Sequence, residues 1–257
     1  MVPPGIPLGR SIDLPWFESI PQNARARLED IGYNFNQHLT LGYMDTTMET
    51  LYSPQKLAEA IRDQFAQIGV KIDLKPWAPE RLIQNIAEGK EAFFLYWFPI
   101  DYLDGSAFFE KPFVNQSNAF GNPYTDIQAE ITTLRRTSDP KLRQESFDRL
   151  NKIVLNQAPL IPLGHSPSLS VFRSDQKNLS SNAFFENLED VQSPKGVIRY
   201  MGAAEPLSLW PADEDDNSTF RITRLLYDTL LSPGFAGETF EPLLAETWES
   251  NADLTQW

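Results

Sequence analysis

The residues of this sequence best suited to chemistry are two carboxylates, Asp101 and Asp104, which follow a run of aromatic residues. Two carboxylates can act as general acid and general base, but an i,i+3 spacing in a loop fixes no particular geometry. An Asp that follows a strand is also a common turn residue, because its side chain accepts hydrogen bonds from nearby backbone amides. The spacing alone therefore gives only weak support to a hydrolase.

Metal sites and nucleophilic sites have little support. The chain has no Cys, which excludes disulfides, thiolate zinc sites and cysteine nucleophiles. Its two histidines, His38 and His165, are far apart in the sequence. The acidic run 213–216 begins like an EF-hand calcium loop, but Ser218 stands where that loop needs Gly, and Arg224 where it needs Glu. We expect no metal and no cofactor.

Composition sets outer limits on the function. The chain has 257 residues, of which 41% are hydrophobic and 22% charged, and its net charge is −13. These values are ordinary for a globular protein with a sizeable core, and the acidic balance argues against binding to nucleic acid through a basic face. The longest apolar run, Ala92–Ile100, is far shorter than the ~20 residues that span a bilayer. The first residues lack the features of a signal peptide, so an export signal is expected outside this chain.

The elements that position the two carboxylates alternate between strand and helix patterns. Ser53 followed by Pro54 is a strong helix start, with Ser as N-cap and Pro at the first position. Such alternation is typical of an α/β layer with a parallel sheet and crossover helices. In chain order the predictions are a strand at 38–44, a helix at 53–68, a strand at 70–74, a helix at 78–88 and a buried strand at 92–98.

Beyond residue 100 the predicted elements are shorter and more widely spaced. A loop region at 101–124 is followed by helices at 125–137 and 140–157. The pattern then restarts near residue 193. The remaining predictions are strands at 160–163 and 197–200, a helix at 219–231 and an extended segment at 239–248.

Several motifs resemble the family 5 extracellular solute-binding proteins, which include oligopeptide, dipeptide and nickel receptors. Residues 97–104 read WFPIDYLD and are similar to the family pattern W-x-x-D-Y-x-D-P, although Gly105 replaces the usual Pro. Residues 64–72, QFAQIGVKI, are similar to L-x-x-I-G-I-x-V. Residues 158–163, APLIPL, are similar to A-P-x-I-P-L. These motifs belong to the later part of such a receptor.

A second block of the chain resembles the beginning of a mature receptor. Residues 241–249, EPLLAETWE, match the pattern x-P-x-L-A-E-S-W-E closely, and residues 226–230, LYDTL, resemble I-Y-E-G-L. The resemblance therefore implies two blocks in swapped order. We divide the chain into a carboxyl-terminal receptor portion at 1–192, a linker at 193–197 and an incomplete amino-terminal receptor portion at 198–257.

The resemblance implies an α/β fold, namely a type II periplasmic-binding-protein-like lobe with part of a second lobe. It implies a substrate-binding component of an ABC importer, which captures peptides or a similar small solute and delivers them to permease subunits in the membrane. Such a protein lies in the periplasm or outside the cytoplasm, associates with the membrane through the transporter, and is not an enzyme. The alternative is a ligand-sensing domain of a regulator whose DNA-binding module lies outside this chain.

The resemblance also implies a binding site. In peptide receptors of this family a carboxylate of the 97–104 motif pairs with the α-ammonium of the ligand, a role that falls here to Asp101. Trp97, Phe98 and Tyr102 stand beside it and are expected to line the cleft. Read from the residues alone, Asp101 caps a turn and Trp97 is a core residue. The middle of a receptor, which supplies the other wall of the cleft, has no counterpart here, so we expect the isolated chain to bind peptides weakly or not at all.

Overall fold

The computed structural model divides into two compact units, residues 1–164 and 165–257. Each unit is considered by itself. The structure describes residues 1–3, 6, 8–10, 20–46, 53–98, 100, 102, 104–115, 121, 124–165, 171–181, 186–188, 190–202, 205–213, 217–233 and 240–257.

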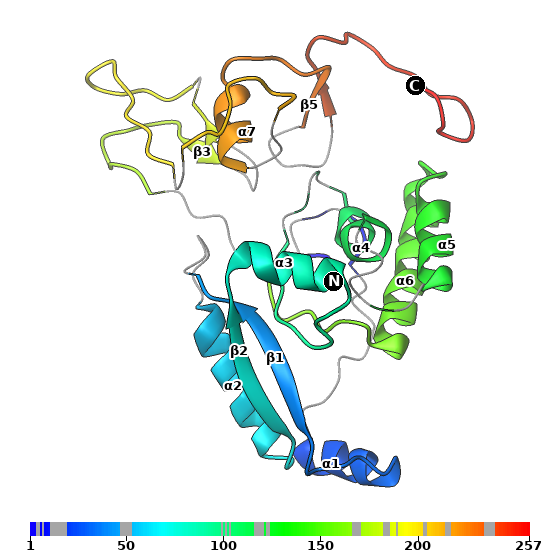
Figure 1. Cartoon of the computed structure of the whole chain (residues 1–257). Coiled ribbons are helices and arrows are strands. Elements are labelled where there is room, and N and C mark those ends of the chain that lie inside the picture. The colour runs from blue at the N-terminus through cyan, green and yellow to red at the C-terminus, as the bar shows by residue number, and fades with distance from the viewer. Residues whose placement is uncertain are drawn as a thin grey trace. The chain divides into compact units, whose positions relative to one another are not determined.

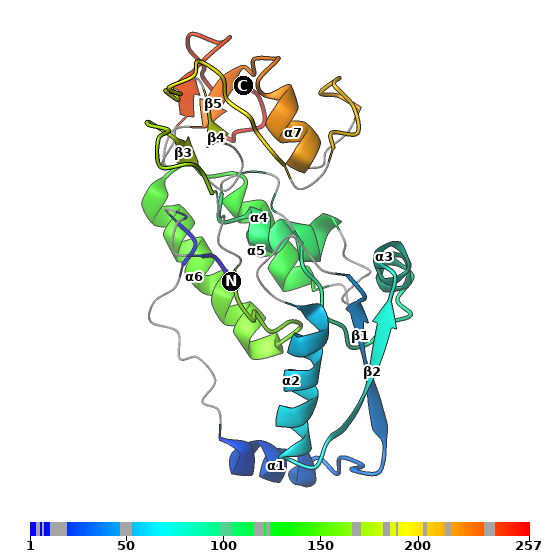
Figure 2. The same ribbon diagram turned by 90° about the vertical axis from the view of Figure 1, so that its left-hand side faces the viewer.

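The first unit begins with a parallel β-α-β arrangement, which confirms the predicted alternation (Figure 1). After α1 (Pro21–Asp30), strand β1 (His38–Met44) pairs in parallel with β2 (Lys71–Trp77), and α2 (Pro54–Ala66) connects them. The predicted cap is present, since the Ser53 side chain accepts a hydrogen bond from the Lys56 amide and Pro54 occupies the first turn. Figure 2 shows α2 lying along the two strands.

Helices cover both faces of this small sheet. On one face Leu41 and Ile72 pack in a cluster with Ala58 of α2. On the other face, at the end of the strands, Met44 packs against Leu82 and other residues of α3 (Pro79–Ala87). Because successive side chains of a strand point to opposite faces, this arrangement fixes which residues of the sheet face each helix.

The strand predicted at 92–98 is reduced to a single bridge. Phe94 pairs in parallel with Gly42, whose amide donates to Phe93 O at 3.0 Å and whose carbonyl accepts from Leu95 N at 2.8 Å. Neighbouring side chains alternate as a strand requires, with Phe93 in the α2 cluster and Phe94 in the α3 cluster. The prediction that both faces are buried was wrong. These side chains stay half-buried because, among the described residues, no strand pairs with the outer edge of the segment.

Two antiparallel helices complete the first unit, α5 (Thr125–Leu134) and α6 (Pro140–Gln157). Both were predicted, and Figures 1 and 2 show them side by side. Asp139 caps α6 by accepting from the Leu142 amide at 2.9 Å. The helix ends at Ala158, which has a left-handed φ of 47°, just before a proline.

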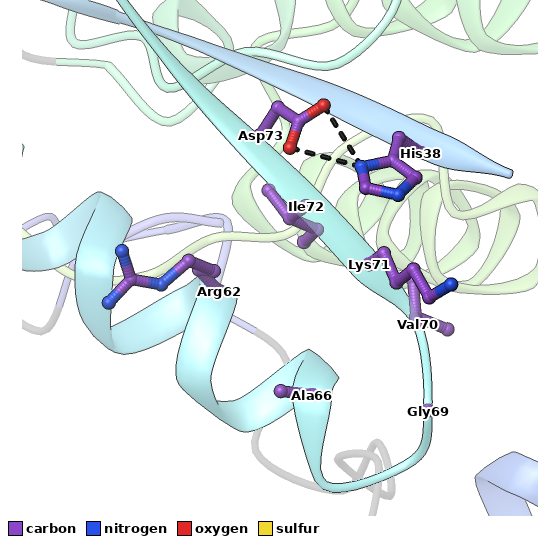
Figure 3. A pocket seen from close by; sticks show the side chains of 8 residues that line it. All are labelled: His38, Arg62, Ala66, Gly69, Val70, Lys71, Ile72 and Asp73. Carbon is purple, nitrogen blue, oxygen red and sulfur yellow. Dashed lines mark hydrogen bonds and ion pairs between the residues drawn. The ribbon is translucent and has the colours of Figure 1, made fainter. Parts of the chain in front are cut away.

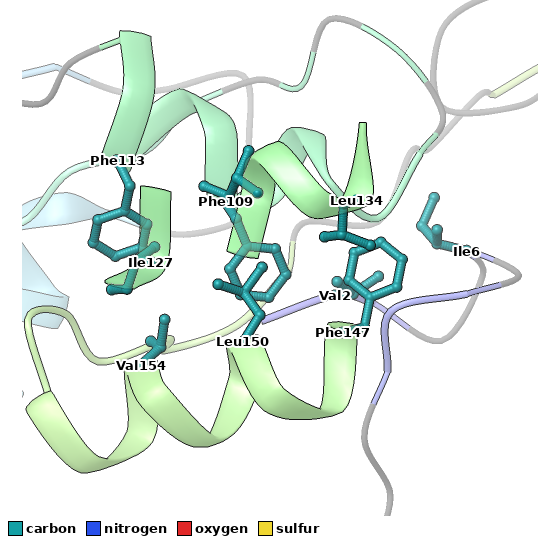
Figure 4. Packing of buried hydrophobic residues seen from close by; sticks show 10 residues of the cluster. Val2, Ile6, Phe109, Phe113, Ile127, Leu134, Phe147, Leu150 and Val154 are labelled. Carbon is teal, nitrogen blue, oxygen red and sulfur yellow. The ribbon is translucent and has the colours of Figure 1, made fainter. Parts of the chain in front are cut away.

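The largest apolar cluster lies between α5, α6 and a segment that was predicted to be a loop (Figure 4). That segment forms α4 (Ala107–Glu110) and the single π-helical turn η1 (Lys111–Asn115). Phe109 and Phe113 are one helical turn apart, and both side chains are fully buried in the cluster. The loop prediction for 107–115 was therefore wrong, because burial of these two rings outweighs the polar character of the flanking residues.

The second unit has little regular structure. Its short elements are β3 (Ser180–Ser181) paired with β4 (Glu186–Asn187), α7 (Asn217–Thr223), and β5 (Leu231–Pro233) paired with β6 (Phe240–Pro242). The strands predicted at 160–163 in the first unit and at 197–200 here do not form, and α7 is shorter than predicted. Within its described part, this unit has no buried hydrophobic side chain. Helical turns without apolar packing gain too little to persist.

Candidate functional site

Trp97 and Phe98, the first residues of the 97–104 motif, follow a stretch of chain that is paired with the sheet. That stretch runs parallel to β1 at the bridge between Gly42 and Phe94, so Trp97 and Phe98 come three and four residues after the bridge, in the direction in which β1 ends at Met44. Ligands of open α/β sheets bind outside the carboxyl ends of the strands. Trp97 and Phe98, which open the motif singled out in the sequence, therefore follow the carboxyl end of the strands, where a ligand is expected.

The structure describes three of the four predicted site residues. Trp97 and Phe98 are half-buried, and Tyr102 is 42% exposed. Trp97 and Phe98 are consecutive, and Tyr102 lies four residues further along the chain. Asp101 lies outside the described residues, and its role as the partner of a ligand ammonium stays a prediction.

Aromatic rings on alternate residues lead from the sheet into this segment. The rings of Phe94 and Tyr96 meet edge to face with centroids 6.4 Å apart, and those of Tyr96 and Phe98 lie 6.1 Å apart. Such ring pairs stabilise by about 0.5–1.5 kcal/mol beyond the area that they bury. Half-buried rings of this kind offer apolar surface to a ligand while being held in place by their neighbours.

Tyr102 is held by its neighbours on α4. Its hydroxyl lies 3.4 Å from Ser106 Oγ, and its carbonyl accepts from the Asp104 amide at 3.0 Å. Burial raises the pKa of Tyr102 to about 12. The phenol is therefore neutral at physiological pH and can serve a ligand as a hydrogen-bond donor or as an apolar surface, but not as a base.

Asp104 is engaged in structural contacts. Its two carboxylate oxygens accept from Arg143 Nη2 at 2.8 and 2.7 Å, and Oδ1 also accepts from the Ser106 amide at 2.8 Å. The interpretation of Asp104 as a turn residue agrees with these contacts. A carboxylate so occupied by an arginine and a backbone amide is poorly placed to exchange protons with a substrate.

A second bidentate pair lies close by. Arg135 of α5 donates to Glu110 of α4 at 3.2 and 2.6 Å, and the Glu110 side chain is only 9% exposed. Burial alone raises the pKa of Glu110, but hydrogen bonds from Arg135 and Tyr102 outweigh it, so the pKa lies below its ordinary value of 4.5. The carboxylate therefore stays charged at neutral pH and ties α4 to α5.

Replacing Glu110 by Gln is expected to lower the free energy of unfolding by about 2 kcal/mol at pH 7. The loss is smaller than for a fully buried ion pair, because Arg135 is half exposed. A carboxylate whose folded pKa is depressed stabilises the fold above 4.5 and loses that contribution as pH falls through the folded pKa. The difference between variant and wild type should thus shrink from pH 5 to about pH 3. Urea denaturation at each pH measures it; a pH-independent difference would contradict the role of the charge.

Sequence reasoning missed Arg135, Arg143 and Glu110. Neither arginine was singled out within the predicted helices at 125–137 and 140–157, and Glu110 fell in a predicted loop. Arg135 is 25 residues from Glu110 in the sequence, and Arg143 is 39 residues from Asp104. Pairs so far apart produce no local pattern in the sequence. Recognising 107–113 as helical, from its two phenylalanines one turn apart, would have placed Glu110 on an element.

A cavity elsewhere in the unit lies at the opposite end of the strands. It is lined by residues at the start of β1 and β2, including His38 and Lys71, and by Arg62 and Ala66 of α2 (Figure 3). His38 Nδ1 lies 3.1 Å from the Asp73 carboxylate. Because ligands of open α/β sheets bind at the carboxyl ends of strands, this cavity at the amino ends is a weaker candidate than the aromatic segment.

Other kinds of site find no support in the part of the chain that the structure describes. In these residues no group of three or more His, Cys, Asp or Glu side chains is arranged to hold a metal ion. Within the same residues, no helix has the length and apolar character to cross a membrane.

Comparison with known proteins points to peptide receptors. No family model matches the chain. It is 23% identical over 172 residues to di/tripeptide-binding protein 4 of Pseudomonas aeruginosa, a match that covers 65% of this chain and 32% of that protein. It is 27% identical over 172 residues to the peptide transport periplasmic protein SapA of Salmonella typhimurium, covering 64% of this chain and 31% of the relative.

Solved structures give the same fold. The Helicobacter pylori periplasmic binding protein DppA, in complex with the peptide STSA, superposes with a TM-score of 0.55 at 20% identity, over 63% of this chain and 31% of that chain. A dipeptide-binding protein from Pseudoalteromonas in complex with Met-Leu superposes with a TM-score of 0.54 at 21% identity, over 63% of this chain and 33% of that chain.

The chain spans about a third of the length of the curated relatives that it matches. Its fold is that of part of a periplasmic binding protein of the peptide-binding type, as predicted. The order of the two sequence blocks and their boundaries stay predictions. In sequence and in fold the chain is thus related to the peptide-binding proteins of ABC transporters, which confirms its resemblance to solute-binding protein family 5.

Proposed function

We propose that this chain forms one lobe of the substrate-binding component of an ABC importer, and that the cargo is a peptide. The observation that supports the proposal is that Trp97 and Phe98 follow the parallel bridge between Gly42 and Phe94 at the carboxyl end of β1, in a chain whose named relatives are peptide-binding and peptide-transport proteins. A lobe of this kind needs no chemistry of its own. It needs a rigid edge that offers apolar rings and a charged partner to the ligand.

The residues proposed to meet the ligand are Trp97, Phe98, Asp101 and Tyr102. Asp101 pairs with the α-ammonium of the peptide, because an ammonium removed from water is costly unless a carboxylate accepts its hydrogen bonds. Trp97 and Phe98 supply apolar surface for peptide side chains, and the neutral Tyr102 hydroxyl borders the same edge. The contacts of Asp104 with Arg143 support a binding role over acid–base catalysis.

Partners and location follow from the same proposal. The chain works in the periplasm or outside the cytoplasm, and its ligand-loaded form docks on the permease subunits of the transporter in the membrane. It turns over no substrate. The regulator alternative gains nothing from the comparisons, since the named relatives are transport and periplasmic binding proteins.

The test is a titration of the purified 257-residue chain with a pool of tri- to pentapeptides, followed by NMR of the indole N–H groups. The chain has 6 Trp, and the variant Trp97→Phe identifies the signal of Trp97. We expect that signal to shift at millimolar peptide while the signals of tryptophans remote from the site stay in place. The sequence left two outcomes, weak binding or none; we propose weak binding, because the chain carries the proposed site residues but spans only about a third of its relatives' length.

Free amino acids serve as the control ligand, and they should leave the Trp97 signal unchanged at the same concentration. If no signal moves at about 10 mM peptide, a concentration that detects even millimolar dissociation constants, the proposed cargo is wrong. Steady release of amino acids during the titration would instead indicate a hydrolase.

A further inference from the structure

Arg143 occupies a central position behind the candidate site. Besides the two bonds to Asp104, its Nη1 donates to the carbonyl oxygens of Leu134 at 2.9 Å and Thr137 at 3.2 Å. The guanidinium carbon lies 5.7 Å from the centre of the Phe147 ring, and the side chain is only 16% exposed. One planar group thus joins the end of α5, the start of α6 and the residue that closes the 97–104 motif.

Gly105, next to Asp104, is packed on its other side. A Cβ built at Gly105 would lie 2.7 Å from Leu8 O and 2.9 Å from Phe147 Cζ, so no side chain fits there. This explains why Gly stands where family 5 members usually have Pro. A Cβ at Gly9, likewise, would lie only 3.3 Å from the Gly105 Cα. The segment 8–10 therefore closes over the residue that follows Asp104.

The segment 8–10 is itself tied to α6. The Gly9 amide donates to Gln144 Oε1 at 3.2 Å, and its carbonyl accepts from Asn151 Nδ2 at 2.9 Å. Gln144 Nε2 also donates to Arg10 O at 3.2 Å. Residues 104 and 105 are thus held between α6 and a segment that α6 fixes, and they form a firm anchor for the chain that precedes them.

From these contacts we infer that Arg143 is a positioning residue of the ligand site: by holding Asp104 it anchors Tyr102 and the stretch of chain to which Asp101, the proposed partner of the ligand, belongs. This inference rests on the proposed function. Asp104 is hydrogen-bonded to the carbonyl of Tyr102, and three residues of chain span at most about 11 Å. An ion pair between Asp101 and a ligand ammonium depends strongly on distance and angle, so a loosened anchor weakens that one contact first.

If Arg143 only stabilised the fold, a different result would be expected. Loss of stability lowers the fraction of folded protein and affects every ligand alike. A displaced Asp101, by contrast, weakens peptides with a free amino terminus and spares N-acetylated peptides, which have no ammonium. The ratio of the two affinities is therefore the informative quantity, because it does not depend on how much of the protein is folded.

The experiment measures that ratio for the 257-residue chain by NMR titration with a tripeptide pool and with the same pool N-acetylated. In Arg143→Met and Asp104→Asn we expect the preference for free amino termini to fall at least fivefold, and in Arg143→Lys to an intermediate value, since Lys keeps the charge but loses the fork geometry. Arg149→Met is the matched control: Arg149 also lies on α6 and pairs with Glu130 of α5, away from Asp104.

The outcomes separate the inference from the proposed function. Suppose that the wild type prefers free amino termini and that circular dichroism shows both Arg143→Lys and Asp104→Asn to be folded. If these two variants keep the preference in full, Arg143 is not a positioning residue. Equal loss in Arg149→Met would likewise overturn the inference, because any damage to α6 would then suffice. A wild type that binds both pools equally removes Asp101 from its proposed role, and one that binds neither contradicts the proposed function; the inference falls with either.

Discussion

Replacing Phe147 by Ala is expected to lower the free energy of unfolding of the first unit by about 3–5 kcal/mol, the cost of removing a large ring from a close-packed core. Phe147 is fully buried between α5, α6 and the amino-terminal segment. Its ring lies 6.2 Å from that of Phe109 and below the guanidinium of Arg143. The loss should appear in urea denaturation followed by circular dichroism.

The matched control is Leu142→Ala, at a position of the same helix that is 52% exposed. Substitutions at such exposed positions usually change stability by less than about 0.5 kcal/mol. If the two variants lose similar stability, the cluster of Figure 4 is not the core of this unit. If only Phe147→Ala loses stability, the cluster that Phe147 forms with Phe109 of α4 is the core of this unit.

The elements that the sequence predicted correctly carry strong local signals. Ser53 and Asp139 cap α2 and α6, each followed by Pro in the first turn. The strand at 38–44 ends exactly where the alternation of side chains predicts. Caps and periodicity act within a few residues, so they determine such elements before any long-range contact is known.

The elements that the sequence predicted wrongly depend on distant partners. The run at 92–98 has the composition of a central strand, but strand pairing needs neighbours, and among the residues that the structure describes only Gly42 provides one. The helix predicted at 219–231 ends at Thr223, because Leu226 and Leu230 remain exposed and gain nothing from helical packing. Local pattern shows what a segment can form, and packing determines what it does form.

The candidate site was predicted in part. Sequence reasoning located the aromatic segment and assigned a turn role to Asp104, with which the structure agrees. It gave no sign of Arg143, because helix-surface arginines are common and the partner lies 39 residues away. The residues proposed to contact a ligand form a local motif, whereas the residues proposed to hold that motif in place are distributed along the chain.

The second unit contains contacts between the two predicted blocks, whose order stays a prediction. In the second unit Arg221 of α7 forms an ion pair with Glu186 of β4, and the Tyr200 hydroxyl donates to Glu186 at 3.4 Å. Residues 200 and 221 belong to the second block and Glu186 to the end of the first. Residues of the two predicted blocks thus contact one another within this unit.

Replacing Asp101 by Asn is expected to weaken the binding of peptides with a free amino terminus by at least thirtyfold, since removing the partner of a desolvated charge costs about 2–5 kcal/mol. Asn keeps the size of the side chain and its ability to accept a hydrogen bond, but it has no charge to balance the ammonium. NMR titration of the indole N–H signals measures the loss, and at the peptide concentration that half-saturates the wild type the variant should show very little shift of Trp97.

N-acetylated peptides provide the internal control, because without an ammonium they gain little from a carboxylate, and their affinity should change less than twofold. Asp104→Asn should also weaken free-amino peptides, through the loosened anchor, but less than Asp101→Asn, which removes the charge itself. An equal loss for free and acetylated peptides in Asp101→Asn would mean that Asp101 acts on the fold of the segment, as a turn residue does, and not on the ligand. The size of the preference for a free amino terminus, compared across these two variants, thus distinguishes the residue that binds the ligand from the residue that places it.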